Sequence, residues 1–384
     1  MTVRPRLDTT YMAEQSRRLR IVIAGGGTGG HLFPGIAVAR EIESRRPDAI
    51  ISFVGTWRGI ESRVVPLEGF ELDLIRSGGL KGKSLAARVR GSILLPLGLA
   101  DAWRVVSNRR PHLVFGVGGY SSGPVVLVAA LRGIPTLLLE QNAVPGLTNR
   151  LLAPFARAAA VTFESTTTFF GAKAFVSGNP VRPEFLKAVE SVEARKELEP
   201  DAEASSARVL VFGGSQGAHA INVAMVEAAE ELAAHAPRLH LTHQTGDRDV
   251  AMVGAAYRKA GLAADVAPFF DDMERRVGRA DLIVCRAGAT TLAEITAAGK
   301  AAILIPLPTA TDDHQRKNAE ALAAAGAAEV LIQSDLTGHT LARRILTLAT
   351  DRETRMRMSA AARKMARPDA AQMIVDRALE LVKM

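Results

Sequence analysis

The chain has 384 residues, a formal net charge of +8 and a single cysteine, Cys285. This length is large for one hydrophobic core and sufficient for two domains, and apolar and charged fractions of 48% and 23% argue against extensive disorder. One cysteine excludes an intramolecular disulfide framework and fits a reducing compartment. No run reaches the roughly 18–20 apolar residues of a membrane span. Residues 1–19 lack the apolar core of a secretory signal, so we expect a flexible N-terminal extension there.

The positive charge belongs to the first half of the chain. Residues 1–183 contain 23 Lys and Arg against 12 Asp and Glu (+11), residues 184–384 contain 25 against 28 (−3), and the two sum to +8. This asymmetry predicts an anionic partner for the first half: a nucleic acid, an anionic membrane surface or a phosphorylated ligand. Aromatic residues make up only 5% of the chain, which disfavours nucleic acid because bases bind by stacking.

Short β-branched apolar runs alternate with helical stretches in both halves, which predicts an α/β fold with two parallel sheets. Strands are expected over 20–24, 50–54, 113–117, 136–140, 158–162, 174–176, 209–212, 239–244, 264–267, 282–285, 302–305 and 328–331. Helices are expected over 35–44, 84–109, 122–132, 220–234, 249–260, 290–298 and 314–324. The prolines and glycine of 178–183 predict a boundary between an N-terminal domain (20–183) and a C-terminal domain (184–384). A last helix, about 368–384, is expected to pack back on the N-terminal domain.

A glycine-rich loop follows the first strand of each half. The loops are Gly25-Gly26-Gly27-Thr28-Gly29-Gly30-His31 and Gly213-Gly214-Ser215-Gln216-Gly217-Ala218-His219. A strand–loop–helix of this kind aims backbone N–H groups at a phosphate, although a single loop could equally be a tight turn. Their repetition predicts two Rossmann-like domains that face each other across a cleft and hold two substrates.

Two common nucleotide enzymes fit these loops poorly. A dinucleotide site needs an acidic residue at the end of the second strand, and the first acid beyond 50–54 is Glu61. The second loop lacks the lysine of a P-loop NTPase. A third cluster, Gly118-Gly119-Tyr120-Ser121-Ser122-Gly123-Pro124, follows the strand at 113–117. Loops at the carboxyl ends of adjacent strands can share one ligand, so a second phosphorylated substrate is indicated in the first half.

Several single residues are candidates for chemistry. His31 begins a helix beside the first loop, where a neutral imidazole could act as a general base or simply pack. Glu294 follows the strand at 282–285 and could accept ribose hydroxyls or lie on a helix surface. The run Asp312-Asp313-His314-Gln315 suits a helix cap or sugar binding better than a metal. Cys285 is interpreted as a small strand residue.

Basic and apolar residues are mixed over residues 80–95, with Trp103 and Arg104 downstream. Such a stretch fits a membrane-surface patch, in which apolar groups enter the interface and arginines meet anionic lipid. A buried helix with a solvated basic edge remains the alternative.

The ordered set of motifs resembles one family, the MurG-type transferases, which move N-acetylglucosamine (GlcNAc) from UDP to undecaprenyl-linked muramoyl-pentapeptide in peptidoglycan synthesis. The resemblance rests on the first loop, the Gly118–Pro124 cluster, Glu140-Gln141-Asn142-Ala143 with Gly146-Leu147-Thr148-Asn149, Gly178-Asn179-Pro180-Val181-Arg182, the second loop, Cys285-Arg286 with Gly288-Ala289, and Asp313-His314-Gln315 with Asn318. These motifs span about residues 20–320 and so cover most of the chain.

The resemblance implies a GT-B type glycosyltransferase fold and an inverting hexosyl transfer to the C4 hydroxyl of the acceptor, with no catalytic metal or cofactor. His31 would be the catalytic base. The donor UDP-GlcNAc would contact Thr28, Gly29, Gly30, Asn142, Arg182, Ser215, Phe270, Ala289, Thr290, Thr291, Leu292, Ala293, Glu294 and Gln315. The acceptor diphosphate would lie on loops that contain Gly27, Gly118, Gly119, Tyr120 and Ser121. The family also implies a peripheral protein on the cytoplasmic face of the cell membrane, with cell-wall synthesis and division proteins as partners.

Other classes of function stay open at this stage. A UDP-GlcNAc 2-epimerase would need no lipid acceptor, and a non-catalytic UDP-sugar-binding protein would tolerate loss of His31. A related transferase with another lipid acceptor is disfavoured by the Gly118–Pro124 and Glu140–Asn149 motifs.

Overall fold

The computed structural model describes residues 18–77, 85–198, 206–214, 217–235 and 239–382, and for 85–95 and 192–198 the backbone alone. The described residues form two compact units. Unit 1 contains the residues up to Gln141, Pro145–Pro180 and those from Asp369 on, and unit 2 contains Asn142–Val144 and Val181–Pro368. The chain therefore leaves unit 1 for unit 2 and returns to unit 1 for its last helix.

Unit 1 is built on a parallel sheet of seven strands in the order β3-β2-β1-β4-β5-β6-β7. Its strands are β1 (Arg20–Ala24), β2 (Ile50–Gly55), β3 (Glu71–Leu74), β4 (Leu113–Gly116), β5 (Thr136–Glu140), β6 (Ala158–Val161) and β7 (Ala174–Val176). Helices cover both faces, so the central strands are apolar on both sides. Ile21 and Ile23 of β1 belong to the core layer with α2 (Gly29–Arg45) and α17 (Ala370–Val382). Val22 belongs to the layer with α4 (Leu85–Arg109) and α5 (Ser122–Leu131).

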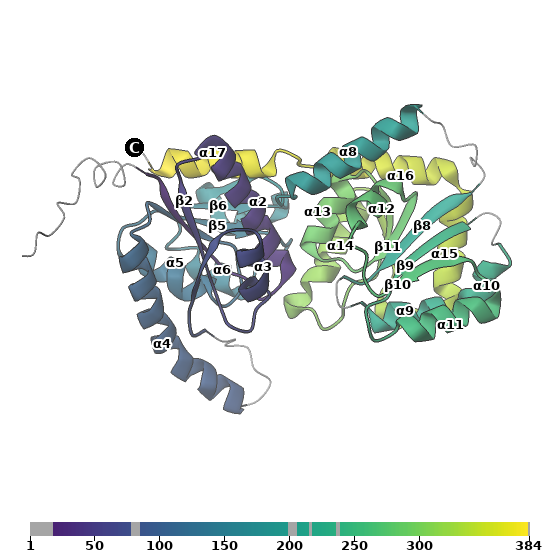
Figure 1. The fold of residues 1–384 in the computed structure, drawn as a ribbon, viewed down its shortest axis with the longest axis horizontal. Helices are drawn as coiled ribbons and strands as arrows, with labels where there is room; N and C mark the ends of the chain where they lie inside the picture. The colour runs from purple at the N-terminus through teal and green to yellow at the C-terminus, as the bar shows by residue number, and fades with distance from the viewer. Residues whose placement is uncertain (1–17, 78–84, 199–205, 215–216, 236–238, 383–384) are drawn as a thin grey trace, which may run out of the picture. The chain divides into compact units, whose positions relative to one another are not determined.

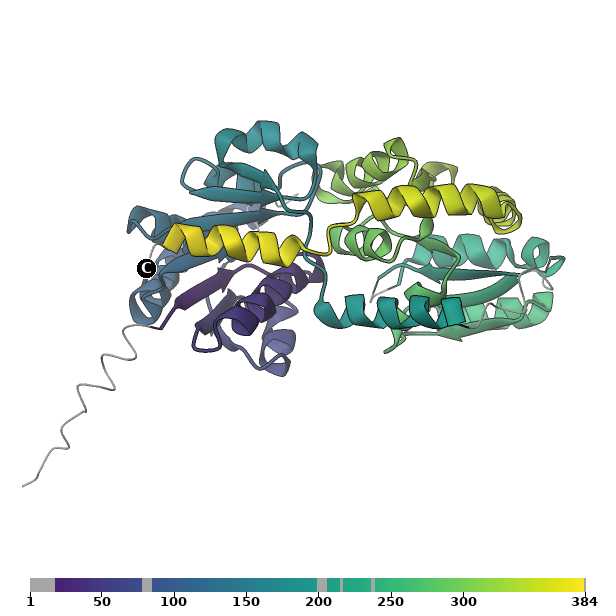
Figure 2. The ribbon, with the colours of Figure 1, turned by 90° about the horizontal axis from the view of Figure 1, so that it is seen from above.

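The helices of unit 1 are α2 (Gly29–Arg45), α3 (Glu61–Leu67), α4 (Leu85–Arg109), α5 (Ser122–Leu131), α6 (Leu147–Leu152), α7 (Thr167–Phe170) and α17 (Ala370–Val382). Figures 1 and 2 show α17 beside α2, although more than 300 residues separate them in the chain. Ile374 and Val375 are fully buried in the unit 1 core, and Arg45 of α2 forms an ion pair with Asp376. The last helix is therefore part of the unit 1 core.

Unit 2 repeats the plan with six parallel strands in the order β10-β9-β8-β11-β12-β13. Its strands are β8 (Ala207–Phe212), β9 (Leu239–Gln244), β10 (Ala264–Ala267), β11 (Leu282–Cys285), β12 (Ala301–Leu304) and β13 (Ala328–Val330). Its helices are α8 (Pro183–Leu198), α9 (His219–Glu227), α10 (Ala229–Ala233), α11 (Val250–Ala260), α12 (Met273–Arg279), α13 (Ala289–Ala297), α14 (His314–Ala324), α15 (Gly338–Thr350) and α16 (Arg352–Met365). Val209 and Val211 of β8 pack with Ile221 of α9 and Ile345 of α15, and Figure 1 shows these helices with α11 on one face of the sheet.

The predicted α/β fold with two parallel sheets is confirmed, and every predicted strand is present with ends within two residues. The predicted helix over 220–234 is interrupted, because α9 and α10 meet at Ala228. Strand β3 and helices α3, α6, α7, α8, α12, α15 and α16 were not predicted.

Three predictions fall on parts of the chain outside the description. They are the flexible extension, of which residues 1–17 are not described, the side chains of the basic and apolar stretch up to residue 95, and Ser215. None of the described helices is long and apolar enough to cross a membrane.

Candidate active site

The first and third glycine loops of unit 1 meet through their backbones. They follow β1 and β4, which are neighbours in the sheet. The Gly26 N–H donates to the Gly118 carbonyl at 3.3 Å, and a Cβ at Gly119 would lie 2.4 Å from the Gly26 oxygen. Gly118 and Gly119 have φ angles of +93° and +81°, in the left-handed region that favours glycine. The two loops are adjacent, as the sequence predicted, and only glycine permits an approach this close.

His31 lies in the first turn of α2, between these two loops. Its Nδ1 is 3.3 Å from the Thr28 hydroxyl, and its backbone N–H donates to the Thr28 carbonyl at 3.2 Å. A Cβ at Gly118 would lie 2.6 Å from the imidazole Cδ2, so the ring packs directly on the third loop. The ring is partly exposed, as are Gly29 and Gly30. The structure thus brings together the predicted base and the predicted acceptor loops.

The outer part of the third loop presents one aromatic side chain to solvent. Tyr120 is 55% exposed, whereas Ser121 is buried. The Tyr120 carbonyl accepts a hydrogen bond from the Ser77 hydroxyl at 2.7 Å, which ties the loop to the segment after β3. Tyr120 is therefore positioned by its backbone while its ring stays available to a ligand.

In unit 2, the second glycine loop is closed by its own backbone and packs on the end of β9. The Gly217 N–H donates to the Gly214 carbonyl at 3.0 Å. Gly217 has a φ of +71°, and a Cβ there would lie 1.9 Å from the Thr245 oxygen. The loop leads into α9, whose N-terminus can receive an anion.

Gln244, at the end of β9, links this loop to the segment around Phe270. Its Nε2 donates to the Gly214 carbonyl at 3.2 Å, and its Oε1 accepts the Phe270 N–H at 2.9 Å. The side chain is buried, with 3% exposure. A carboxamide can donate and accept at once, so one side chain holds both segments that are predicted to contact the donor.

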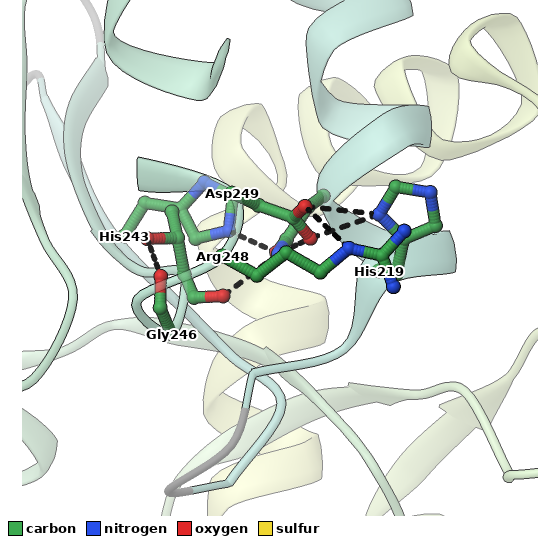
Figure 3. Close-up of polar contacts among 7 residues, drawn as sticks. His219, His243, Gly246, Arg248 and Asp249 are labelled. Atoms are coloured by element: carbon green, nitrogen blue, oxygen red, sulfur yellow. Dashed lines mark hydrogen bonds and ion pairs between the residues drawn. The ribbon is translucent and has the colours of Figure 1, made fainter. Parts of the chain in front are cut away.

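A polar chain runs from the head of α9 into the core of unit 2 (Figure 3). His219 Nδ1 lies 2.9 Å from the Asp249 carboxylate, which also accepts from Asn222 Nδ2 at 2.8 Å. Asn222 Oδ1 is 3.1 Å from His243 Nε2, and His243 Nδ1 is 2.8 Å from the Tyr257 hydroxyl. Burial lowers the pKa of His243 to about 3, so its ring is neutral, donates from Nε2 to Asn222 and accepts from Tyr257. Burial opposes the charge of Asp249, but the hydrogen bonds from Asn222 and His219 keep its pKa below the ordinary value.

Glu294 lies within α13 and faces Arg182. The closest approach of the guanidinium to the Glu294 carboxylate is 3.9 Å, and the glutamate side chain is only 20% exposed. Burial raises the pKa of Glu294 to about 7, the Arg182 charge acts in the opposite direction, and Glu274 adds to the rise. The preceding residues of α13, which share its N-terminal turns, are Ala289, Thr290, Thr291, Leu292 and Ala293. The structure brings Glu294, the predicted ribose ligand, beside Arg182, another residue predicted to contact the donor.

The first turns of α14 and the segment after β5 contain two more predicted donor residues, Gln315 and Asn142. Gln315 Oε1 accepts the Leu307 N–H at 3.0 Å. Asn318 is fully buried; its Oδ1 accepts the Ala143 N–H at 2.8 Å and its Nδ2 donates to Asn142 Oδ1 at 3.1 Å. Asn142 and Gln315 are therefore both held by hydrogen bonds within unit 2.

Of the two roles predicted for the aspartates before α14, the structure does not support the helix cap, and sugar binding stays a prediction. Asp313 occupies the N-cap position, but its side chain accepts no capping hydrogen bond. Asp312 and Asp313 have φ angles of +55° and +54°, which place both in the left-handed region. Within the residues that the structure describes, no group of three or more His, Cys, Asp or Glu side chains is arranged to hold a metal ion.

Two Rossmann-like units, each with a glycine loop after its first strand, form a fold of the GT-B type. Residues 21–161 match the glycosyltransferase family 28 N-terminal domain, and residues 208–374 match the glycosyltransferase family 28 C-terminal domain. The chain belongs to glycosyltransferase family 28. The predicted family resemblance is thereby confirmed.

Two similar curated relatives share the name UDP-N-acetylglucosamine--N-acetylmuramyl-(pentapeptide) pyrophosphoryl-undecaprenol N-acetylglucosamine transferase. The relative from Anaeromyxobacter sp. (strain K) is 47% identical over 95% of this chain and 94% of its own length. The relative from Pelobacter propionicus is 48% identical over 94% of this chain and 99% of its own length.

Solved structures agree with this fold. The crystal structure of Acinetobacter baumannii MurG superposes with a TM-score of 0.75 and 32% identity, and the match covers 94% of this chain and 99% of that one. The UDP-GlcNAc 2-epimerase from Neisseria meningitidis covers the same shares with a TM-score of 0.65 but only 13% identity, so it shows the fold alone.

Proposed function

We propose that this protein is an inverting glycosyltransferase that moves GlcNAc from UDP-GlcNAc to the C4 hydroxyl of undecaprenyl-diphosphate-MurNAc-pentapeptide. The observation that carries the proposal is the match, over 94–95% of the chain at 47–48% identity, to relatives named for this transfer. In this proposal unit 2 binds the donor and unit 1 binds the acceptor.

The donor would bind to unit 2. The ionised Glu294 carboxylate can accept both ribose hydroxyls, and the α13 residues before it line the nucleoside with the Phe270 backbone. The diphosphate would meet Ser215, the N-terminus of α9 and the Arg182 guanidinium. These groups can stabilise the charge that builds on departing UDP, and no metal is required in this proposal.

The acceptor would bind to unit 1. The N-terminal turn of α2, which follows the first glycine loop, and the third glycine loop would cradle its diphosphate, with Tyr120 at the outer edge. His31 would remove the proton from the C4 hydroxyl as oxygen attacks the anomeric carbon and UDP leaves from the opposite face. The ring's contacts with Thr28 and Gly118 support this role, because they fix its orientation.

The acceptor's lipid places the reaction at a membrane surface. The excess positive charge of residues 1–183 fits a peripheral protein on the anionic cytoplasmic face of the cell membrane. Trp103, 56% exposed on α4 and stacked with Arg132 at 5.0 Å, supports such a contact. Cell-wall synthesis and division proteins are the partners we expect there.

The proposal is tested by UDP release from UDP-GlcNAc, with and without a short-chain analogue of the lipid-linked muramoyl-pentapeptide. Wild type should release UDP only with the acceptor, and His31→Ala should lose this release by about 100-fold or more while UDP still binds. Loss of UDP binding as well would make His31 structural. Wild-type protein that releases no UDP with the acceptor would instead support an epimerase or a UDP-sugar-binding protein.

A further inference from the structure

A buried carboxylate lies beneath the first glycine loop. Glu61 is the first residue of α3 and is 1% exposed. Its Oε2 accepts the Gly27 N–H at 2.7 Å, and its Oε1 accepts the Thr56 N–H at 2.8 Å and the Thr56 hydroxyl at 3.1 Å. One carboxylate thus holds the first glycine loop with one oxygen and the loop after β2 with the other.

Three glycines make room for this carboxylate. A Cβ placed on Gly26 would lie 2.6 Å from the Cδ of Glu61. A Cβ on Gly55 would lie 2.2 Å from its Cγ, and a Cβ on Gly59 would lie 1.9 Å from its Oε2. Contacts this short are impossible for real side chains, so each position needs glycine as long as Glu61 is in place. By sequence Gly26 belongs to a phosphate-binding pattern, but in the structure its missing side chain makes room for the Glu61 carboxylate.

The internal anion changes what the loop offers to a ligand. A buried carboxylate is costly unless its oxygens receive hydrogen bonds, and here backbone N–H groups supply them. The Gly27 N–H is used by Glu61, so in this arrangement it is not among the donors for an acceptor phosphate. Its role is to fix the loop's shape.

The fixed part of the loop connects directly to both sides of His31. Gly27 leads to Thr28, which contacts the imidazole Nδ1 and accepts the His31 N–H. The Gly26 N–H donates to the Gly118 carbonyl. A side chain at Gly118 would collide with the imidazole, which packs against this glycine. A shift of the Gly26–Gly27 peptide would therefore move both contacts that orient the ring.

We infer that Glu61 is a positioning residue for His31: its carboxylate anchors the Gly26–Gly27 peptide, and that peptide carries the two surfaces that hold the imidazole. The inference rests on the proposed function, in which His31 is the base. Glu61 lies more than 25 positions from His31 in the sequence, and the inference assigns it a role in the same reaction.

Two substitutions remove the anchor in different ways. Glu61→Gln keeps one acceptor oxygen but turns an NH2 group toward either the Gly27 or the Thr56 N–H, so one loop is released. Glu61→Asp keeps the charge but is one methylene too short to reach both loops. Glu43→Gln, a glutamate on the surface of α2 in the same unit, is the control and should leave turnover unchanged.

The expected loss follows from one charge-assisted hydrogen bond. Glu61→Gln should lower kcat about 10- to 100-fold, with UDP affinity unchanged because the residues proposed to contact the uridine and the diphosphate lie in unit 2. UDP binding is measured by calorimetry and kcat by acceptor-dependent UDP release from the full-length chain.

A double-mutant cycle separates positioning from general structural damage. If Glu61 acts through His31, Glu61→Gln should lower the residual rate of His31→Ala by less than about 2-fold. An equal loss in both backgrounds, or wild-type kcat for Glu61→Gln, would overturn the inference. If thermal unfolding shows that Glu61→Gln does not fold, Glu61→Asp takes its place in the cycle. Wild-type turnover by His31→Ala would reject the base assignment and with it the inference about Glu61, whereas the proposed transfer itself fails only if wild type releases no UDP with the acceptor.

Discussion

Glu294 should lower the stability of unit 2 at pH values at which its carboxylate is ionised and can accept hydrogen bonds from ribose hydroxyls. Its pKa is raised from 4.5 to about 7, mainly by burial, so the folded chain resists ionisation of this group. At about 1.4 kcal/mol per pKa unit, the ionised carboxylate costs about 3 kcal/mol of stability at pH 8. Because the folded pKa is the higher one, this cost shrinks as pH falls through 7 and is about 1 kcal/mol at pH 5.

Glu294→Gln replaces the carboxylate with a neutral group of the same shape. The variant should be more stable than wild type by about 3 kcal/mol at pH 8 and by about 1 kcal/mol at pH 5. The same substitution should weaken UDP binding, because a carboxamide cannot accept from both ribose hydroxyls as a carboxylate can. Stability and donor affinity should therefore change in opposite directions.

The assay is urea unfolding of both proteins at pH 5 and pH 8, with UDP affinity measured by calorimetry at pH 8. Glu353→Gln, an exposed glutamate of α16 in the same unit, is the control and should show no such pH-dependent gain. A Glu294→Gln variant that is no more stable than wild type at pH 8, or whose gain is equal at both pH values, would refute the reasoning.

Three further predictions follow from individual contacts. Gln244→Leu leaves the buried Phe270 N–H without its acceptor, so the free energy of unfolding should fall by about 1–3 kcal/mol. Calorimetry should also show weaker UDP binding. Unchanged UDP affinity would contradict the idea that Gln244 holds the second glycine loop and the Phe270 segment in place for the donor. Asp101 has a pKa lowered to about 2 by the Arg76 side chain, so Asp101→Asn should cost about 1–2 kcal/mol in urea unfolding at pH 7, allowing for Arg76's exposure. This difference should shrink as pH falls from 3.8 toward 2, and a constant difference would exclude the charge as its cause. Gly119→Ala should lower acceptor-dependent UDP release at least 10-fold, because its Cβ would meet the Gly26 oxygen. The control is Gly133→Ala, at a position with a similar positive φ but open space around it. This control should cost only about 1 kcal/mol of stability.

The sheets could be predicted from the sequence because their central strands are buried on both faces and read as continuous apolar runs. Strand β3 escaped prediction because it lies at the edge and alternates leucine with Glu71 and Asp73. Both acids pair with Arg109, which is 36 or more residues away, so no local pattern shows their role. Helix α15 did have a signal, since Leu341, Ile345 and Leu348 repeat at helical spacing and all are buried.

The candidate site likewise contains residues that could be predicted from the sequence and residues that could not. Glycine loops are visible in a sequence because few other residues permit such turns, and they led to His31. Glu61 and Gln244 could not be recognised, because their roles depend on backbone N–H groups of Gly27 and Phe270, 34 and 26 residues away. A partner of this kind leaves no trace in residue type, since every residue except proline offers the same N–H.

The return of α17 to unit 1 sets an order on folding during synthesis. A ribosome completes all of unit 2 before it reaches Ile374 and Val375, the residues that fill the core beside α2. Until then the nascent unit 1 exposes the apolar surface that these side chains will cover, and such surface favours aggregation. Helix α17, which is translated after unit 2, therefore decides when unit 1 becomes fully folded.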